Sequence, residues 1–267
     1  MVAAMKSLAQ QRFGRAAADY ATSEVHAKGA SLQRLVELTE PKSHWRVLDV
    51  ATGAGHTALA FAPHVAKVTA TDITEEMLRE ARKLTASRGR TNVRTLHARA
   101  EDLPFPDASF DLVVCRLAAH HFDDMKGFAA EAYRVLMPGG MIGIVDTIAP
   151  DASIVPGRTP EDLRKLTADF EAFKKLSDPS HRRCLGLIEW EQVLAGAGFD
   201  IAHREHLDKE MEFGPWVERM RSNTHTTARL KEMLLTEPLR SFVASRDTGS
   251  GLAFTLKEGM VTGKKPR

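Results

Sequence analysis

A glycine turn between two apolar runs constrains the fold of this chain more than any other feature of its sequence. Residues 47–50 are apolar apart from one acid, and Gly53 and Gly55 follow before the sequence continues with helix-forming residues. A second apolar run, 68–71, ends on Asp72. Glycine lets a backbone turn sharply and approach a ligand without a Cβ in the way. The pattern therefore predicts a strand, a helix and a second, parallel strand.

The same unit predicts a site for an adenosine-containing ligand. The first N–H groups of a helix that begins near Gly55 have no partner within the helix, so they point at whatever lies in the turn. Asp72, at the tip of the second strand, can accept hydrogen bonds from ribose hydroxyls. The spacing from Gly53 through Gly55 to Ala58 also satisfies the dinucleotide pattern, which is a weak signal on its own.

The rest of the chain alternates between strands and helices. Apolar runs predict strands at 46–50, 67–71, 92–98, 110–115, 141–146, 200–207 and 254–263, and helical spacing predicts helices at 55–62, 74–89, 125–136 and 189–197. This alternation is typical of an α/β fold, here a Rossmann-like, doubly wound, mostly parallel sheet of seven strands. We expect the last strand to contain a turn at Glu258-Gly259 and to run antiparallel, because a short connection cannot make a parallel crossover.

Composition narrows the partners and the location. The net charge is +2, from 37 basic and 35 acidic residues, so we expect no nucleic acid partner. Cys115 and Cys184 are isolated, which fits a reducing compartment and predicts no metal site. No apolar run approaches the roughly 18 residues of a membrane span. We expect a cytoplasmic protein. Residues 1–18 carry basic residues and no acid, which fits an amphipathic helix or, alternatively, a transit peptide.

Three features argue against a nicotinamide dinucleotide as the ligand. Asp49 lies inside the first strand, where an acid would repel a pyrophosphate but attract a cationic amine. The acidic pair Glu101-Asp102 follows the third strand and can accept a hydrogen bond from an adenine amino group. Neither of the 2 tyrosines is followed four residues later by a lysine, the pair that often catalyses hydride transfer on this fold.

With these motifs in order, the chain resembles the class I S-adenosylmethionine-dependent methyltransferases. The similarity is to the branch that includes the ubiquinone and menaquinone C-methyltransferases, methyltransferase type 11. The matching motifs lie at 47–58, 71–74, 100–105, 110–116 and 134–140, and a looser match covers 181–199. The C-terminal signature of the quinone enzymes is missing, so the resemblance does not imply a quinone acceptor.

The resemblance implies S-adenosylmethionine as cofactor and a set of binding residues at the strand ends and on the N-terminal segment. They are Tyr20, Asp49, Ala51, Gly53, Gly55, Asp72, Ile73, Met77, Glu101, Asp102, Leu103 and Arg116. In this scheme Asp49 and the glycine turn hold the methionine end, with Arg116 beside it. Asp72 holds both ribose hydroxyls, and Asp102 reads the adenine amino group. Ala51 occupies a position where many relatives have glycine, and Tyr20 is expected as a lid contact.

The resemblance also implies a single methyltransferase domain, 1–267. It divides into an N-terminal helical cap (1–44), a cofactor-binding core (45–148) and cap insertions (149–188 and 207–240). Four large apolar residues in the insertions either wall an acceptor pocket or form ordinary core: Phe170, Phe173, Trp216 and Met220. We expect a monomer or a homodimer that acts on a small-molecule acceptor.

His120 and His121 are the candidate catalytic residues. They follow the fourth strand, where a base would lie near the transferred methyl group, although one could cap the next helix and the other contact the cofactor. The run 181–183, His-Arg-Arg, either binds an anionic acceptor or is a solvated loop. The alternative functions are an NAD(P)-dependent oxidoreductase and a non-catalytic cofactor-binding protein. The sequence does not distinguish O-, N- and C-methylation.

Overall fold

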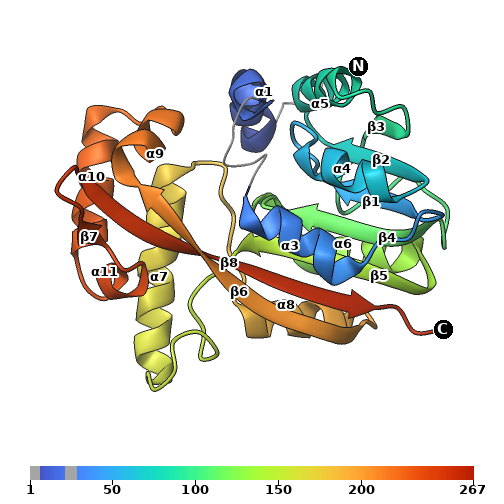
Figure 1. Ribbon diagram of the computed structural model, residues 1–267. Helices are drawn as coiled ribbons and strands as arrows, with labels where there is room; N and C mark the ends of the chain where they lie inside the picture. Colours follow the sequence, from blue (N-terminus) through green and yellow to red (C-terminus); the bar gives the residue numbers. More distant parts are fainter. Residues whose placement is uncertain (1–6, 22–28) are drawn as a thin grey trace, which may run out of the picture.

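A twisted sheet forms the centre of the molecule (Figure 1). The structure, a computed structural model, describes residues 7–21 and 29–267. The strands lie in the order β3-β2-β1-β4-β5-β8-β6, and the short β7 pairs with β8 off this path. Their bounds are β1 (Arg46–Val50), β2 (Lys67–Asp72), β3 (Val93–His97), β4 (Phe110–Arg116), β5 (Leu136–Thr147), β6 (Asp200–Glu212), β7 (Arg246–Asp247) and β8 (Leu252–Lys264).

The sheet confirms the predicted mostly parallel fold with an antiparallel last strand. β8 lies between β5 and β6 and runs antiparallel to both. The expected reason for this direction is wrong, because the connection from β6 to β8 is long and helical. It contains α9 (Phe213–Arg219), α10 (Thr224–Leu235) and α11 (Leu239–Phe242). β6 also runs to Glu212, past the predicted strand end at 207.

The turn predicted at Glu258-Gly259 is also wrong. β8 passes through both residues without interruption. A Cβ at position 259 would lie 2.9 Å from Leu187 Cδ2 and would overlap Ile148. Glycine at this position therefore marks a close approach of neighbouring side chains to the strand, which is a common reason for a glycine within a sheet.

Helices cover both faces of the sheet. α3 (Ala30–Thr39) and α4 (His56–Phe61) pack on one face, and α6 (Met125–Val135) and α8 (Leu187–Gly196) cover the other. α5 (Glu75–Ser87) packs against β2 and β3. The strand order reverses between β1 and β4, so their carboxyl ends open onto the crevice where ligands bind in such sheets.

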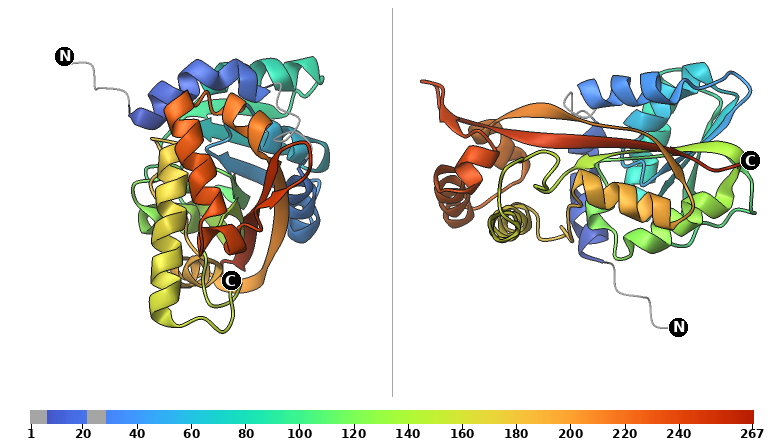
Figure 2. Two further views of the ribbon diagram at one scale, coloured as in Figure 1. Left: turned by 90° about the vertical axis from the view of Figure 1, so that its left-hand side faces the viewer. Right: turned by 90° about the horizontal axis from the view of Figure 1, so that it is seen from below.

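A second group of helices lies beyond this core. The long strands β6 and β8 extend past the parallel sheet, and α9, α10 and α11 surround their far ends together with α7 (Pro160–Ser177) (Figures 1 and 2). Phe170 and Phe173 of α7 are fully buried there against Phe254 and Leu230. These two aromatic residues form the core of the helical group, so they are not a pocket wall.

Helix α1 (Leu8–Ala21) connects the two parts of the molecule. The Gln10 side chain donates a hydrogen bond to the Ile73 carbonyl at 2.9 Å, on the core side. The Arg12 guanidinium pairs with Asp178 at 3.2 Å, just after α7. The crevice at the strand ends therefore lies beneath α1 and between the sheet and the helical group, and two cavities occupy it.

Candidate active site

The glycine turn after β1 has the backbone conformation that the sequence predicts. Ala51 (φ 54°), Gly53 (φ 54°) and Gly55 (φ 91°) all adopt left-handed conformations. A Cβ on Gly55 would lie 2.9 Å from the Ala81 Cβ, so glycine is required for α5 to pack against the turn. Of these three residues only Ala51 carries a Cβ, and a Cβ is sterically strained in this region of φ.

We expect Ala51→Gly to raise the free energy of unfolding by up to ~1 kcal/mol. The left-handed conformation costs a non-glycine residue roughly 1–2 kcal/mol. Glycine removes that strain but adds about 0.5–1 kcal/mol of unfolded-state entropy. Ala51→Val is the matched variant in the opposite direction and should destabilise. Chemical denaturation of the three proteins measures the order, and a less stable Ala51→Gly would contradict the assigned strain.

Asp72 is fixed by the backbone before any ligand arrives. Its Oδ2 accepts a hydrogen bond from the Gly53 amide at 2.9 Å, and its Oδ1 accepts one from the Thr74 amide at 2.8 Å. Burial raises the pKa of this carboxyl, while the two amides lower it in part. Thr74 stands at the N-cap of α5, but its side chain makes no capping bond. Asp72 thus joins the glycine turn to the start of the next helix.

Asp49 is a buried acid beneath the turn. It is 1% exposed, and the Thr52 hydroxyl donates to its Oδ2 at 2.5 Å. Burial raises the pKa of Asp49 to about 7, with the nearby Asp72 adding to the effect and Arg116 opposing it. A buried carboxyl in this state gains a full charge when a cation is placed beside it. The position therefore favours a ligand that carries a positive group.

The first cavity, of about 170 Å³, lies over these residues. The predicted binding residues that line it are Ala51, Gly53, Asp72, Ile73, Met77, Glu101 and Arg116. Asp49 and Gly55 lie behind this wall. Further lining residues that the sequence did not indicate include Thr52, His56, Phe122 and Asp123. Arg182, from the predicted 181–183 run, also lines this cavity. The side chain of Tyr20 lies outside the described residues.

Two of the expected cofactor contacts, Asp102 and Leu103, do not line this cavity. The Asp102 side chain is exposed to solvent, and Leu103 is 3% exposed within the hydrophobic core under α6. The Leu103 amide donates to Glu131 Oε2 at 2.8 Å, which holds this segment against α6. Glu101 does line the cavity, and its carboxylate accepts from the Asp123 amide at 3.2 Å. Glu101 is thus the better placed acid of the pair.

A second cavity, of about 140 Å³, adjoins the first. The two share Phe13, Leu117 and His121 in their walls. Leu117 follows β4 in a left-handed conformation, with φ of 54°. A large side chain in that conformation is strained, and such strain concentrates at functional sites. The remaining walls come from the end of β5, α7, the loop after α7, β6, α9 and β8. They include Thr147, Lys174, His181, Lys209, Met211, Trp216, Met220, Leu256 and Glu258.

His120 lies in the second cavity and is held by a buried acid. Its Nδ1 is 2.5 Å from Asp146 Oδ1, and its backbone amide donates to Asp146 Oδ2 at 2.8 Å. Asp146 lies near the end of β5 and is 1% exposed. Burial favours a higher pKa for Asp146, but the His120 imidazole and its hydrogen bonds lower that pKa overall. An ionised Asp146 accepts a hydrogen bond from Nδ1–H of His120, so the lone pair of the neutral ring is on Nε2.

His121 has a different environment from its neighbour. Its Nδ1 lies 3.2 Å from the Ser180 carbonyl, and its ring packs edge-on against Phe13. Burial, together with the adjacent His120, lowers the pKa of His121 to about 3. His121 is therefore neutral near pH 7 and forms a shared wall of both cavities. The two predicted catalytic histidines differ, and only His120 has the geometry of a base.

The 181–183 run divides among three environments. His181 is buried beside the second cavity, Arg182 lines the first and pairs with Asp123 at 3.0 Å, and Arg183 is exposed and pairs with Glu189. The solvated-loop alternative thus holds for the exposed side chains of Arg182 and Arg183 but not for the buried His181.

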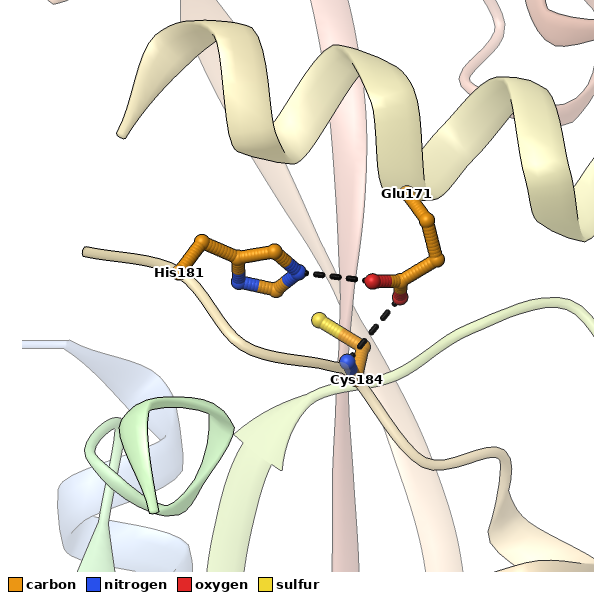
Figure 3. A group of neighbouring side chains, drawn as sticks. All are labelled: Glu171, His181 and Cys184. Carbon is orange, nitrogen blue, oxygen red and sulfur yellow. Dashed lines mark hydrogen bonds and ion pairs between the residues drawn. The ribbon is translucent and has the colours of Figure 1, made fainter. Parts of the chain in front are cut away.

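His181, Glu171 and Cys184 form a compact buried group (Figure 3). Their potential ligand atoms lie within 4.8 Å of one another, a spacing that a metal ion can bridge. Both carboxylate oxygens of Glu171 already accept hydrogen bonds, from His181 Nε2 at 2.8 Å and from the Cys184 amide at 2.9 Å. The network holds the loop against α7 without a metal, and the prediction of no metal stays a prediction.

Fold and site together define a class I S-adenosylmethionine-dependent methyltransferase. The sequence profile of the family described as "Methyltransferase domain" matches residues 48–144. The chain is also 32% identical over 261 residues to the uncharacterized methyltransferase YcgJ of Bacillus subtilis, covering 95% of this chain and 97% of that protein. The chain therefore belongs to this family of methyltransferases, and the oxidoreductase alternative is wrong.

Solved structures and curated relatives agree with this assignment. The crystal structure of a putative methyltransferase from Bacillus halodurans superposes with a TM-score of 0.80 at 33% identity, covering 90% of this chain and 100% of that one. The demethylmenaquinone methyltransferase of Thermus thermophilus is 39% identical over 127 residues, 46% of this chain and 57% of that enzyme. Within residues 7–21 and 29–267, no helix has the length and apolarity needed to cross a membrane.

Proposed function

We propose that the protein methylates a small molecule bound in the second cavity, with His120 as the general base. The observation that carries the proposal is the His120–Asp146 pair in the wall of a cavity that adjoins the cofactor cavity. In a methyl transfer, the protein mainly aligns the acceptor with the methyl group and removes the acceptor proton. A separate small cavity with a base in its wall suits both tasks.

The residues of the first cavity fit S-adenosylmethionine. Asp72 offers carboxylate oxygens at the strand tip. The amino group of a methionine moiety would stabilise the charged form of the buried Asp49. Ile73 and Met77 supply apolar surface for a purine ring. When bound, S-adenosylmethionine supplies a methyl group on a sulfonium, whose sulfur keeps the electron pair of the broken carbon–sulfur bond.

Most of the acceptor site is built from parts of the chain outside the matched family profile, although His120 itself lies inside it. The profile ends at residue 144, whereas Lys174, His181, Lys209 and Trp216 all follow it. The demethylmenaquinone methyltransferases match less than half of this chain. Their acceptor is therefore no guide to the one bound here.

A labelling experiment tests the proposal. The purified protein is incubated with S-adenosylmethionine that carries a tritiated methyl group and with a cell extract divided by ultrafiltration. We expect label to enter the low-molecular-mass fraction only, because a cavity of about 140 Å³ cannot admit a polymer backbone and its flanking residues. Label in protein or nucleic acid would overturn the small-molecule acceptor. Binding of S-adenosylhomocysteine without any transfer would instead indicate a non-catalytic protein.

A further inference from the structure

The size of the second cavity suits a single six-membered ring. Its volume is about 140 Å³. An engineered protein cavity of about 150 Å³ binds benzene, which sets the scale for one ring. Trp216, Met211, Met220 and Leu256 give the chamber an apolar wall. Aromatic and thioether groups pack well against a flat ring.

One charged side chain in the wall of this cavity has no ion-pair partner among the described residues. Asp178 pairs with Arg12 at 3.2 Å, and Glu258 pairs with Lys209 at 2.6 Å. Lys174 lines the cavity, half-buried on α7, and forms no ion pair with any residue that the structure describes. The chamber wall therefore carries an unpaired ammonium group, which favours an anionic ligand.

The nearest acid on the same helix does not neutralise Lys174. Glu171 is one turn earlier, but its two oxygens accept hydrogen bonds from His181 Nε2 and the Cys184 amide. Figure 3 shows the carboxylate of Glu171 facing these two residues. Burial is the main cause that lowers the pKa of His181. The charges of His120 and Lys174 lower it further, so both residues lie close to His181. The base and the free ammonium group thus flank the same buried ring.

His181 adds a hydrogen-bonding position between them. Its ring centroid lies 5.6 Å from that of His120. Its Nδ1 is buried and has no hydrogen-bond partner in the part of the chain that the structure describes. Because Nε2 donates to Glu171, Nδ1 is an acceptor.

We propose that the acceptor is a monocyclic hydroxyl compound with a separate anionic group, a hydroxyarene carboxylate or similar, and that Lys174 binds the anion. The inference rests on the proposed function. The acceptor hydroxyl gives its proton to His120 Nε2, and its oxygen forms the new bond to the methyl carbon. The broken carbon–sulfur bond leaves its electron pair on sulfur, so the charges balance. A cationic amine acceptor is disfavoured because it would face Lys174.

The test is a binding experiment with matched probes. Protein saturated with S-adenosylhomocysteine is titrated calorimetrically with 2-, 3- and 4-hydroxybenzoate and with the corresponding neutral hydroxybenzamides. We expect at least one hydroxybenzoate to bind about tenfold to a hundredfold more tightly than its amide, the range of a charge-assisted contact. Lys174→Gln should remove that preference. Lys165→Gln, the same charge change at an exposed site on α7, should leave it intact.

Each result decides between the proposals. Equal binding of benzoates and benzamides, a preference that survives Lys174→Gln, or no binding of any probe to protein loaded with S-adenosylhomocysteine would overturn the acceptor class. None of these results affects the assignment of the first cavity. Failure to bind S-adenosylhomocysteine at all would instead remove the proposed function on which the inference rests.

Discussion

Replacing Asp72 with alanine should weaken S-adenosylhomocysteine binding at least about a hundredfold. The carboxylate is the charged acceptor at the tip of β2. The Gly53 and Thr74 amides hold its two oxygens where they can accept hydrogen bonds from the hydroxyls of a ribose. Hydrogen bonds to a charged group contribute about 1.5–3 kcal/mol each, so the loss of two corresponds to a hundredfold or more. Calorimetric titration of wild type and variant measures the change.

Two controls separate binding from folding in this experiment. Asp72→Asn keeps an acceptor oxygen and should lose less affinity than Asp72→Ala. Asp102→Ala removes an acid of the same type at a neighbouring strand end, but the Asp102 side chain is exposed and outside the cavity. Its affinity should therefore match that of the wild type. Unchanged affinity in Asp72→Ala would refute the ribose assignment, and a loss in Asp102→Ala would restore the adenine role that the sequence suggested.

The residues around the first cavity could be predicted because they lie close together in the sequence. The glycine turn, Asp49 and Asp72 belong to a single strand–helix–strand unit, and hydrogen bonds between neighbours in that unit fix their geometry. The strands β1 to β5 follow from short apolar runs between turn residues, so most of the parallel sheet could also be predicted. Asp102 was misplaced because a sequence does not show which of two adjacent acids faces a crevice.

The second cavity could not be predicted because its walls come from segments that are far apart in the sequence. The walls of the second cavity come from α1, the end of β4, α7, β6, α9 and β8. Asp146 is 26 residues from His120, and the pairing of β4 with β5, which places Arg116 opposite Val145, brings the two together. Gly259 was predicted to form a turn, but it allows a close contact within a strand. The sequence alone does not distinguish these two uses of glycine.

Replacing His120 should abolish most methyl transfer while leaving cofactor binding intact. Loss of a general base typically lowers a rate about 10²–10⁴-fold. His120→Asn is the variant of choice, because its amide can still donate to Asp146. His120→Ala would remove the side-chain partner of the buried Asp146 carboxylate and leave it only backbone amide donors, which lowers stability. The rate is measured with the labelled small-molecule fraction as acceptor, and S-adenosylhomocysteine affinity is measured in parallel.

The pH dependence distinguishes a base from a structural histidine. Transfer that depends on a histidine base should rise with pH, since only a neutral imidazole can accept a proton from the acceptor. His121→Gln should keep this rising limb, because a pKa of about 3 leaves His121 neutral throughout the range. His120→Asn should lose it. Asp146→Asn should lower kcat with little change in KM, since Asp146 contacts His120 and does not line the cavity. A rising limb that survives in His120→Asn would place the base elsewhere.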